Sequence, residues 1–182
     1  INMEKRNYPK LLILGHMRHG KDTLAEIMNE VFGLTFKSSS QSAAEIFLYD
    51  ALKDKYGYQT PEECFEDRIN HRDEWYTAIC DYNKDNRARL ANNIIEKVDC
   101  YVGMRDKAEF DECVKQKIFD LIIWVDASKR LPLEPGTSFN INMSDADIIV
   151  ENNGTYEEFV EKSKRIGRVI FKKFNTDNII YS

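Results

Sequence analysis

The stretch of sequence that decides the fold is Gly15-His16-Met17-Arg18-His19-Gly20-Lys21-Asp22-Thr23. It follows the apolar run Leu11–Leu14 and precedes Leu24–Met28, in which the apolar residues have the spacing of a helix. A strand, a loop bounded by glycines, a lysine and a helix, in this order, form a phosphate-binding P-loop. An ordinary strand-to-helix turn that contains Gly and Lys is the competing interpretation, and the strand and helix on either side favour the P-loop.

Each part of this loop has a physical reason. Gly15 and Gly20 allow a tight turn, so that backbone N–H groups point at phosphate oxygens. The following helix adds the positive end of its dipole at the same place, and Lys21 supplies a mobile positive charge. One residue departs from the motif, because Asp22 stands where Ser or Thr is expected and Thr23 comes one place later.

The composition indicates one soluble domain. The chain has 182 residues, of which 42% are hydrophobic and 31% charged, which suffices for a sizeable core. No apolar run approaches the ~20 residues of a membrane span, and the N-terminus lacks a signal-peptide core, so we expect a cytoplasmic protein with no membrane partner. The net charge of −5 disfavours broad nucleic-acid binding without excluding a local basic cleft.

The cysteines give a second indication of the compartment. They are widely spaced and form no C-x-x-C pair, which favours free thiols in a reducing cytoplasm over disulfides or a zinc site. The cysteines are Cys64, Cys80, Cys100 and Cys113.

Strands alternate with helices, which predicts an α/β domain with a parallel sheet. The predicted strands are 11–14, 34–36, 100–104, 121–125 and 148–150. The predicted helices are 21–32, 43–56, a run from 60 to about 78, 86–96, 108–117 and 156–174.

We expect a single domain over residues 10–174. Residues 1–9 form an N-terminal extension, in which Ile1 and Asn2 look like a cloning remnant before Met3, and 175–182 form a tail. Residues from about 41 to 97 form a helical acceptor-binding region. The stretch from about 128 to 145 is rich in Pro, Gly, Ser and Asn, and so long an irregular segment is a candidate lid.

Basic residues are the first candidates for chemistry, because phosphoryl transfer needs positioning and positive charge. Arg18 lies inside the loop, and Arg105 follows a predicted strand, where ligands bind in parallel sheets. Arg68 and Arg72 share one helix face, which disfavours them energetically unless a phosphate or an acidic side chain lies between them. A solvated helix face with local ion pairs is an equal alternative for this pair.

Two acidic residues are candidates for magnesium. Asp126 ends a predicted buried strand near the P-loop, and Asp22 occupies the position of the usual metal-binding hydroxyl. Either carboxylate could instead cap a turn or a helix. The flanking histidines, His16 and His19, are more often spectators than catalytic bases.

Three blocks resemble phage deoxynucleoside monophosphate kinases. The first is Gly20-Lys21-Asp22-Thr23, with Asp in the metal position. The second is Tyr101–Arg105 followed by Ala108-Glu109, although Ala108 stands where Asn is usual. The third is Ala146–Thr155 followed by Glu157-Glu158, which is similar to the family's closing strand, Asn-x-Gly turn and helix.

This resemblance implies a three-layer P-loop kinase fold, with a central parallel sheet between helices, that uses ATP and Mg²⁺. The implied catalytic residues are Lys21, Arg18 and Arg105. The implied ATP-binding residues are Gly15, His16, Met17, His19, Gly20, Lys21, Asp22, Thr23, Arg130, Asn152, Asn153 and Gly154. The expected acceptor-binding residues are Ser38, Ser39, Ser40, Arg68, Arg72, Arg87, Arg89 and Glu109, and the expected metal ligands are Asp22 and Asp126.

The expected reaction transfers the γ-phosphate of ATP to a deoxynucleoside monophosphate, in the host cytoplasm if the chain is of phage origin. One alternative is a kinase that acts on a modified nucleotide or on a hydroxymethylated base in phage DNA. A second is a nucleotide-binding protein without catalysis, because fold alone does not fix function. The expected partners are small-molecule nucleotides, and the sequence leaves a homodimer open.

Overall fold

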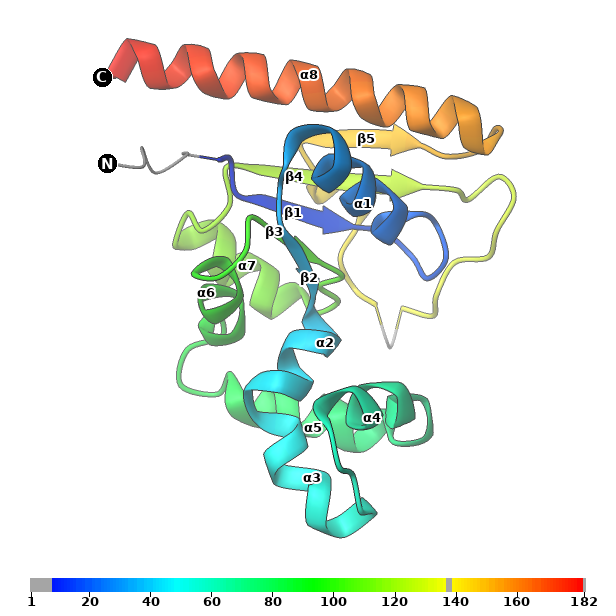
Figure 1. The fold of residues 1–182 in the computed structure, drawn as a ribbon, viewed down its shortest axis with the longest axis vertical. Helices are drawn as coiled ribbons and strands as arrows, with labels where there is room; N and C mark the ends of the chain where they lie inside the picture. The colour runs from blue at the N-terminus through cyan, green and yellow to red at the C-terminus, as the bar shows by residue number, and fades with distance from the viewer. Residues whose placement is uncertain (1–7, 137–138, 182) are drawn as a thin grey trace.

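A five-stranded parallel sheet forms the centre of the structure, a computed structural model that describes residues 8–136 and 139–181 (Figure 1). The strand order is β2-β3-β1-β4-β5, and every neighbouring pair is parallel. The strands are β1 (Leu11–Leu14), β2 (Phe36–Ser38), β3 (Cys100–Val102), β4 (Leu121–Asp126) and β5 (Ile148–Glu151). The predicted fold class, an α/β fold with a central parallel sheet flanked by helices, is confirmed.

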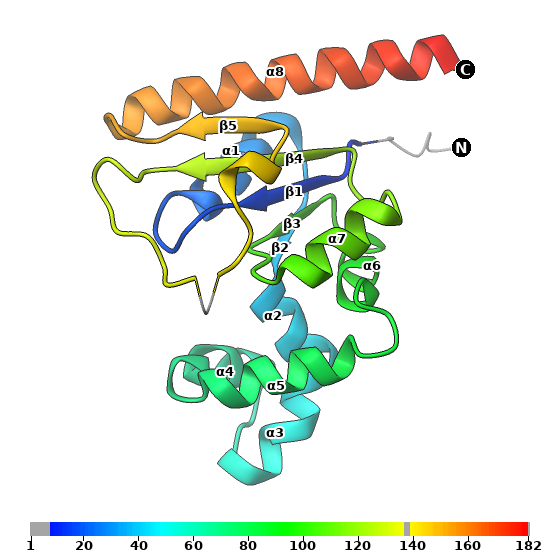
Figure 2. The same ribbon diagram turned by 180° about the vertical axis from the view of Figure 1, so that it is seen from behind.

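Helices cover both faces of the sheet, as Figures 1 and 2 show. Helices α1 and α8 lie on one face, α6 and α7 lie on the other, and α3, α4 and α5 project from the body near β2. The helices are α1 (Lys21–Phe32), α2 (Ser39–Ala43), α3 (Tyr49–Tyr56), α4 (Pro61–Glu66), α5 (Arg72–Tyr82), α6 (Arg89–Ile95), α7 (Lys107–Lys115) and α8 (Tyr156–Tyr181). Short turns η1 (Ala44–Leu48), η2 (Asp67–Asn70) and η3 (Met143–Asp145) complete the elements.

The apolar run of β1 is buried on both faces because it is the middle strand. Leu11 and Ile13 join the hydrophobic cluster beneath α1 and α8, whereas Leu12 and Leu14 join the cluster beneath α6 and α7. All four side chains are fully buried. Successive side chains of β1 therefore point into the hydrophobic cores on opposite faces of the sheet, as is usual in a parallel sheet.

Capping hydrogen bonds mark several helix ends. The Ser38 hydroxyl accepts a hydrogen bond from the Gln41 N–H at 3.1 Å, and the Thr60 hydroxyl accepts one from the Glu63 N–H at 3.2 Å. Gly33 and Gly57 end α1 and α3 in the left-handed conformation, with φ of 77° and 73°. These bonds use backbone groups that the helices themselves leave unpaired.

Some predicted element boundaries were wrong, each for a local reason. Strand β2 starts at Phe36 rather than Leu34, because the Leu34 N–H bonds back to Met28 O at 3.3 Å and closes α1. Strand β3 ends at Val102, because Gly103 has a φ of +95°. The helix predicted from residue 60 breaks at His71, which has φ −136°.

The C-terminal region also differs from the prediction. Helix α8 continues past Phe174 to Tyr181, so residues 175–181 extend the helix and do not form a separate tail. Ser182 and most of the predicted N-terminal extension, residues 1–7, lie outside the described residues. Within residues 8–136 and 139–181, no helix has both the length and the apolar character that a membrane crossing requires. All four cysteines are free thiols, as predicted.

Candidate phosphate-binding site

The P-loop connects the carboxyl end of β1 to α1, and its glycines are required by close contacts. A Cβ at Gly15 would lie 2.6 Å from Val125 O, and one at Gly20 would lie 2.7 Å from Asn152 Nδ2. The φ angles at these residues are +150° and +115°. Arg18 is an exposed non-glycine residue with a positive φ, 66°, so the loop turns sharply between the glycines.

Lys21 folds back over its own loop. Its ammonium group donates hydrogen bonds to Gly15 O at 2.8 Å and His16 O at 3.1 Å. Burial, and next the charge of Arg105, lower the pKa of Lys21 to about 8. The charge is therefore held inside the loop, on carbonyl groups that phosphate oxygens can replace.

His19 fastens the loop to the segment that follows β4. Its ring is fully buried, and Nδ1 accepts a hydrogen bond from the Ala127 N–H at 3.0 Å. The other nitrogen, Nε2, lies 3.0 Å from Pro132 O, so it carries the hydrogen and donates it. This side chain holds both ends of residues 127–132 against the loop.

His16 fastens the same segment further along. Its Nδ1 accepts a hydrogen bond from the Glu134 N–H at 2.9 Å, and its ring packs on Phe139 with the centroids 4.7 Å apart. Burial is the main cause of a lowered pKa at His16. The two histidines of the predicted ATP-binding set thus anchor the first part of the candidate lid. Thr137 and Ser138 in that lid lie outside the described residues.

Glu134 is the residue of this site that the sequence did not reveal. One carboxylate oxygen accepts a hydrogen bond from the Met17 N–H at 3.0 Å, and the other is ion-paired with Arg105. Burial alone would raise the pKa of Glu134, but Arg105, the Met17 N–H and the charge of Lys21 together outweigh it and lower the pKa. A lone Glu in an irregular stretch gives no pattern from which this contact can be predicted.

Arg68 is influenced by basic residues from two other segments of the chain. Arg105 follows β3, Arg68 lies in η2 and Arg72 begins α5. Burial, and next the charges of Arg72 and Arg105, lower the pKa of Arg68, while Asp22 raises it. The structure thus brings Arg68 within electrostatic range of Arg72, of Arg105 and of Asp22 at the start of α1.

A cavity of about 110 Å³ opens at the carboxyl ends of β2 and β3. Five predicted site residues line it, namely Ser39, Ser40, Arg87, Arg105 and Glu109. On its wall, the buried Tyr101 hydroxyl donates a hydrogen bond to Glu109 at 2.7 Å. Burial is the main reason that the pKa of Glu109 rises to about 7. The cavity therefore has a carboxyl group poised between its neutral and ionised forms.

Four residues predicted for the acceptor side do not line this cavity, namely Ser38, Arg68, Arg72 and Arg89. The Arg89 guanidinium stacks on the Tyr82 ring, 3.9 Å from its centroid, and donates to Tyr82 O at 3.2 Å. The Ser38 hydroxyl caps α2. Local partners hold both side chains, and the proximity of Arg89 to Arg87 in sequence does not bring the two to the same place.

The predicted adenine-side turn lies against the P-loop. Asn152 Nδ2 donates to His19 O at 2.9 Å, and Arg130 Nε donates to Asn152 O at 2.7 Å. Asn153 Oδ1 accepts from the Lys129 N–H at 3.1 Å, but its buried Nδ2 has no hydrogen-bond partner. The next residue of the turn, Gly154, is exposed.

The predicted metal ligands are placed differently from each other. The Asp126 carboxylate accepts a hydrogen bond from the Ser128 N–H at 3.0 Å, which is the turn-capping alternative. Asp22 is exposed in the first turn of α1, next to Thr23. Among the described residues, no group of three or more His, Cys, Asp or Glu side chains could hold a metal ion. Mg²⁺ usually needs only one or two carboxylates beside phosphate oxygens, which Asp22 fits better than Asp126.

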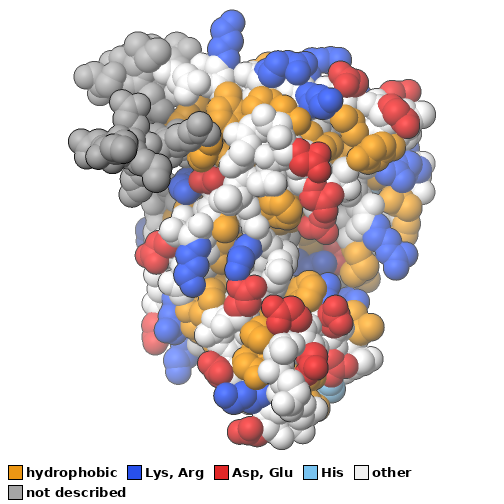
Figure 3. All heavy atoms as spheres, in the orientation of Figure 1, with side chains coloured by type: hydrophobic (Ala, Val, Ile, Leu, Met, Phe, Trp, Pro, Cys, Tyr) orange, Lys and Arg blue, Asp and Glu red, His pale blue; other side chains and the backbone are white. Residues whose placement is uncertain are grey.

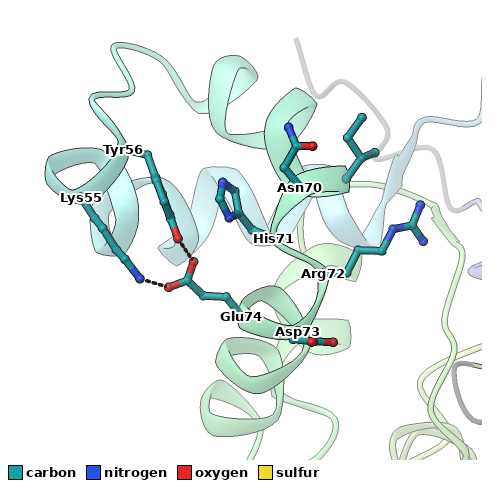
Figure 4. A pocket seen from close by; sticks show the side chains of 8 residues that line it. Lys55, Tyr56, Asn70, His71, Arg72, Asp73 and Glu74 are labelled. Atoms are coloured by element: carbon teal, nitrogen blue, oxygen red, sulfur yellow. Dashed lines mark hydrogen bonds and ion pairs between the residues drawn. The ribbon is translucent and has the colours of Figure 1, made fainter.

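A second hollow lies between α3 and the start of α5, away from the P-loop (Figure 4). Glu74 accepts hydrogen bonds from Lys55 at 2.7 Å and from Tyr56 at 2.6 Å, and the His71 ring stacks on Tyr56. Figure 4 shows the Arg72 side chain pointing away from Glu74. The polar groups of this hollow thus bind one another.

No protein-family model and no curated protein matches the sequence. Solved structures of similar shape include a sugar kinase from Janibacter sp., with 13% identity, a TM-score of 0.42 and coverage of 86% of this chain and 92% of that one. A gluconokinase from Sinorhizobium meliloti has 12% identity, a TM-score of 0.45 and coverage of 92% and 99%. A shikimate kinase from Aquifex aeolicus has 15% identity, a TM-score of 0.44 and coverage of 93% and 98%. TM-scores this low do not indicate an activity or a substrate for this chain.

Proposed function

We propose that this chain transfers the γ-phosphate of ATP to a deoxynucleoside monophosphate. The proposal rests on the groups that surround the Glu134 carboxylate at the P-loop. The Met17 N–H and Arg105 contact Glu134, and Lys21 lies close enough to affect its charge. A carboxylate in this place stands in for phosphate oxygens, which these donors would bind more strongly because phosphate carries more charge.

The donor side of the reaction uses the loop. Its N–H groups and Lys21 would hold the outer phosphates of ATP, because they already bind or surround an anionic group. Arg18, exposed on the turn, would reach the phosphates or cover the base. The unpartnered Nδ2 of Asn153 and the nearby Arg130 support an adenine site at the turn of residues 152–154.

The acceptor side uses the cavity next to Arg105. Arg87, Ser39 and Ser40 line the cavity, and Arg87 would bind the phosphate of the acceptor there. Arg68 and Arg72 do not line it and would add positive charge from outside. Arg105 joins the two sides, since it contacts the anion at the loop and also lines the cavity. In the proposed reaction Arg105 would therefore face the transferring group, on which charge builds in the transition state.

Asp22 is the residue best placed to hold Mg²⁺ or one of its water ligands. When bound, Mg²⁺ neutralises negative charge on the outer phosphates of the nucleotide. Thr23, one residue further into α1, would then serve the inner phosphate.

The polymer alternative is less well supported. Figure 3 shows Lys and Arg side chains interspersed with Asp and Glu over the visible face, not gathered in a continuous stripe. A single hydroxymethylated base would still need a charged groove for its flanking DNA. We therefore rank a mononucleotide acceptor first and a non-catalytic nucleotide-binding role last.

The test incubates the protein with ATP, Mg²⁺ and each of the common deoxynucleoside monophosphates, and measures ADP and deoxynucleoside diphosphate. Parallel reactions contain hydroxymethylated DNA, with label transfer into polymer as the readout. Turnover with at least one mononucleotide supports the proposal. Transfer into polymer only would establish the first alternative, and tight ATP binding without transfer to any acceptor would establish the non-catalytic one.

A further inference from the structure

The segment after β4 places its own carboxylate in the anion site of the P-loop. Glu134 contacts the Met17 N–H and Arg105, and its side chain is only 12% exposed. The charges of Arg105 and Lys21 both help to keep it ionised. Glu134 thus binds Arg105 and the Met17 N–H, and it lies near Lys21, which is assigned to the outer phosphates of the nucleotide.

The backbone of the segment fixes this contact. The Glu134 N–H is held by His16, and the preceding residues are held by His19 through Ala127 and Pro132. These backbone hydrogen bonds therefore hold the Glu134 carboxylate close to the P-loop. These hydrogen bonds form a short strap over the P-loop, residues 127–134, which carries Glu134 at its end.

A phosphate and this carboxylate cannot use the site together. The Met17 N–H has one hydrogen to donate, and two anions that share Arg105 and Lys21 repel each other at close range. We propose that Glu134 is an internal competitor of phosphate: it occupies the nucleotide-free loop, and a bound polyphosphate displaces it together with the strap. This inference rests on the proposed function, because it takes the P-loop as the phosphate site.

The charge balance of the site explains why a competitor would be present. Without nucleotide, Lys21 and Arg105 would face each other as like charges, and Glu134 lies beside both with opposite charge. Removal of the Glu134 charge should therefore have two effects of opposite sign. The nucleotide-free protein becomes less stable, whereas polyphosphate binds more tightly because nothing has to be displaced. If Glu134 had a purely structural role, its substitution would lower both the stability of the protein and its affinity for polyphosphate.

The experiment measures binding of inorganic tripolyphosphate by calorimetry, without Mg²⁺ or acceptor. It compares the wild type with Glu134→Gln, and with Glu96→Gln as a control that removes an exposed carboxylate directly after α6. We expect Glu134→Gln to bind about tenfold more tightly, the scale of one charge-assisted hydrogen bond. The control should stay within about twofold of the wild type. Glu134→Asp keeps the charge but shortens its reach, and provides an intermediate if Glu134→Gln does not fold.

A second readout follows the strap itself. Tripolyphosphate should increase hydrogen exchange at the amides of residues 127–134 in the wild type, because the His16 and Met17 contacts of Glu134 are broken. Equal or weaker binding by Glu134→Gln, or unchanged exchange in the strap, would overturn this inference while the P-loop remains a phosphate site. Absence of binding to every variant would overturn the inference and the proposed function together.

Discussion

His19 Nε2 lies 3.0 Å from the carbonyl oxygen of Pro132, a residue 113 positions later in the chain. The same ring accepts a hydrogen bond from the Ala127 N–H, so one buried side chain holds the P-loop to the segment that follows β4. His19→Ala would leave both backbone groups without their partner. We expect a loss of about 1–3 kcal/mol in the free energy of unfolding, measured by urea denaturation. Hydrogen exchange of residues 127–134 should also rise, whereas His71→Ala, in the distant hollow of Figure 4, should leave that exchange unchanged.

Lys21 is the side chain on which phosphate transfer should depend most. Lys21→Ala removes the charge from the loop, and a contact of this type contributes about 3–4 kcal/mol to the transition state. Turnover should fall by about a hundredfold or more, while circular dichroism should show an intact fold. Lys97→Ala, an exposed residue after α6, provides the matched loss of charge. Near-normal turnover by Lys21→Ala would mean that the loop is not the phosphate site.

The pH dependence of ATP binding should report the same lysine. Burial and Arg105 lower the pKa of Lys21 to about 8, and the protonated form is the one that binds phosphate. Affinity for ATP should therefore decline as pH rises through about 8 and flatten below it. Fluorescence or calorimetric titration of the wild type and Lys21→Met across this range measures the effect. A decline of equal size in Lys21→Met would assign it to another group.

Glu109 should make the stability of the protein depend on pH. Its pKa rises from 4.5 to about 7 on folding, mainly through burial, so the folded chain binds the proton more tightly than the unfolded chain does. The resulting stabilisation of the folded protein is complete below pH 4.5 and is lost as pH rises toward 7. Its size is on the order of 1–3 kcal/mol. Glu109→Gln should retain its stability over that range. Thermal unfolding of both proteins at several pH values distinguishes them, and parallel curves would contradict the assignment.

Arg87 and Arg89 provide a matched pair on the acceptor side. Arg87 lines the cavity beside Glu109, whereas Arg89 is stacked on Tyr82. Arg87→Ala should raise KM for the acceptor by about tenfold, the scale of a charged hydrogen bond, with KM for ATP unchanged. Arg89→Ala should leave both KM values close to those of the wild type. Equal effects of the two substitutions would place the acceptor elsewhere.

Much of the fold followed from local patterns. The alternation of strands and helices predicted the parallel sheet, and the helix predicted from residue 60 does begin there, capped by Thr60. The helix predicted from residue 43 begins earlier, at Ser39 after its cap Ser38. The boundaries that failed depended on single hydrogen bonds or backbone angles. Leu34 is apolar and was predicted to begin a strand, but its N–H donates a hydrogen bond to Met28 O and closes α1 instead.

The candidate site was predictable only in part. The sheet brings the loop, Arg105 and Asn152 to one edge, because parallel strands end there, and this follows from the strand pattern. The contact between Arg89 and Tyr82 could not be predicted from the sequence. It depends on how α5 and α6 pack against each other.

By itself, the sequence determined the P-loop and its position between a buried strand and a helix. Those features depend on residues within a few positions of one another, where backbone geometry and apolar spacing act directly. Only the tertiary structure decided what occupies that loop. Glu134 reaches Met17 across 117 residues of chain, and no local pattern encodes a contact over that separation. The contact exists because β1 and β4 are neighbours in the sheet and their loops leave from the same edge.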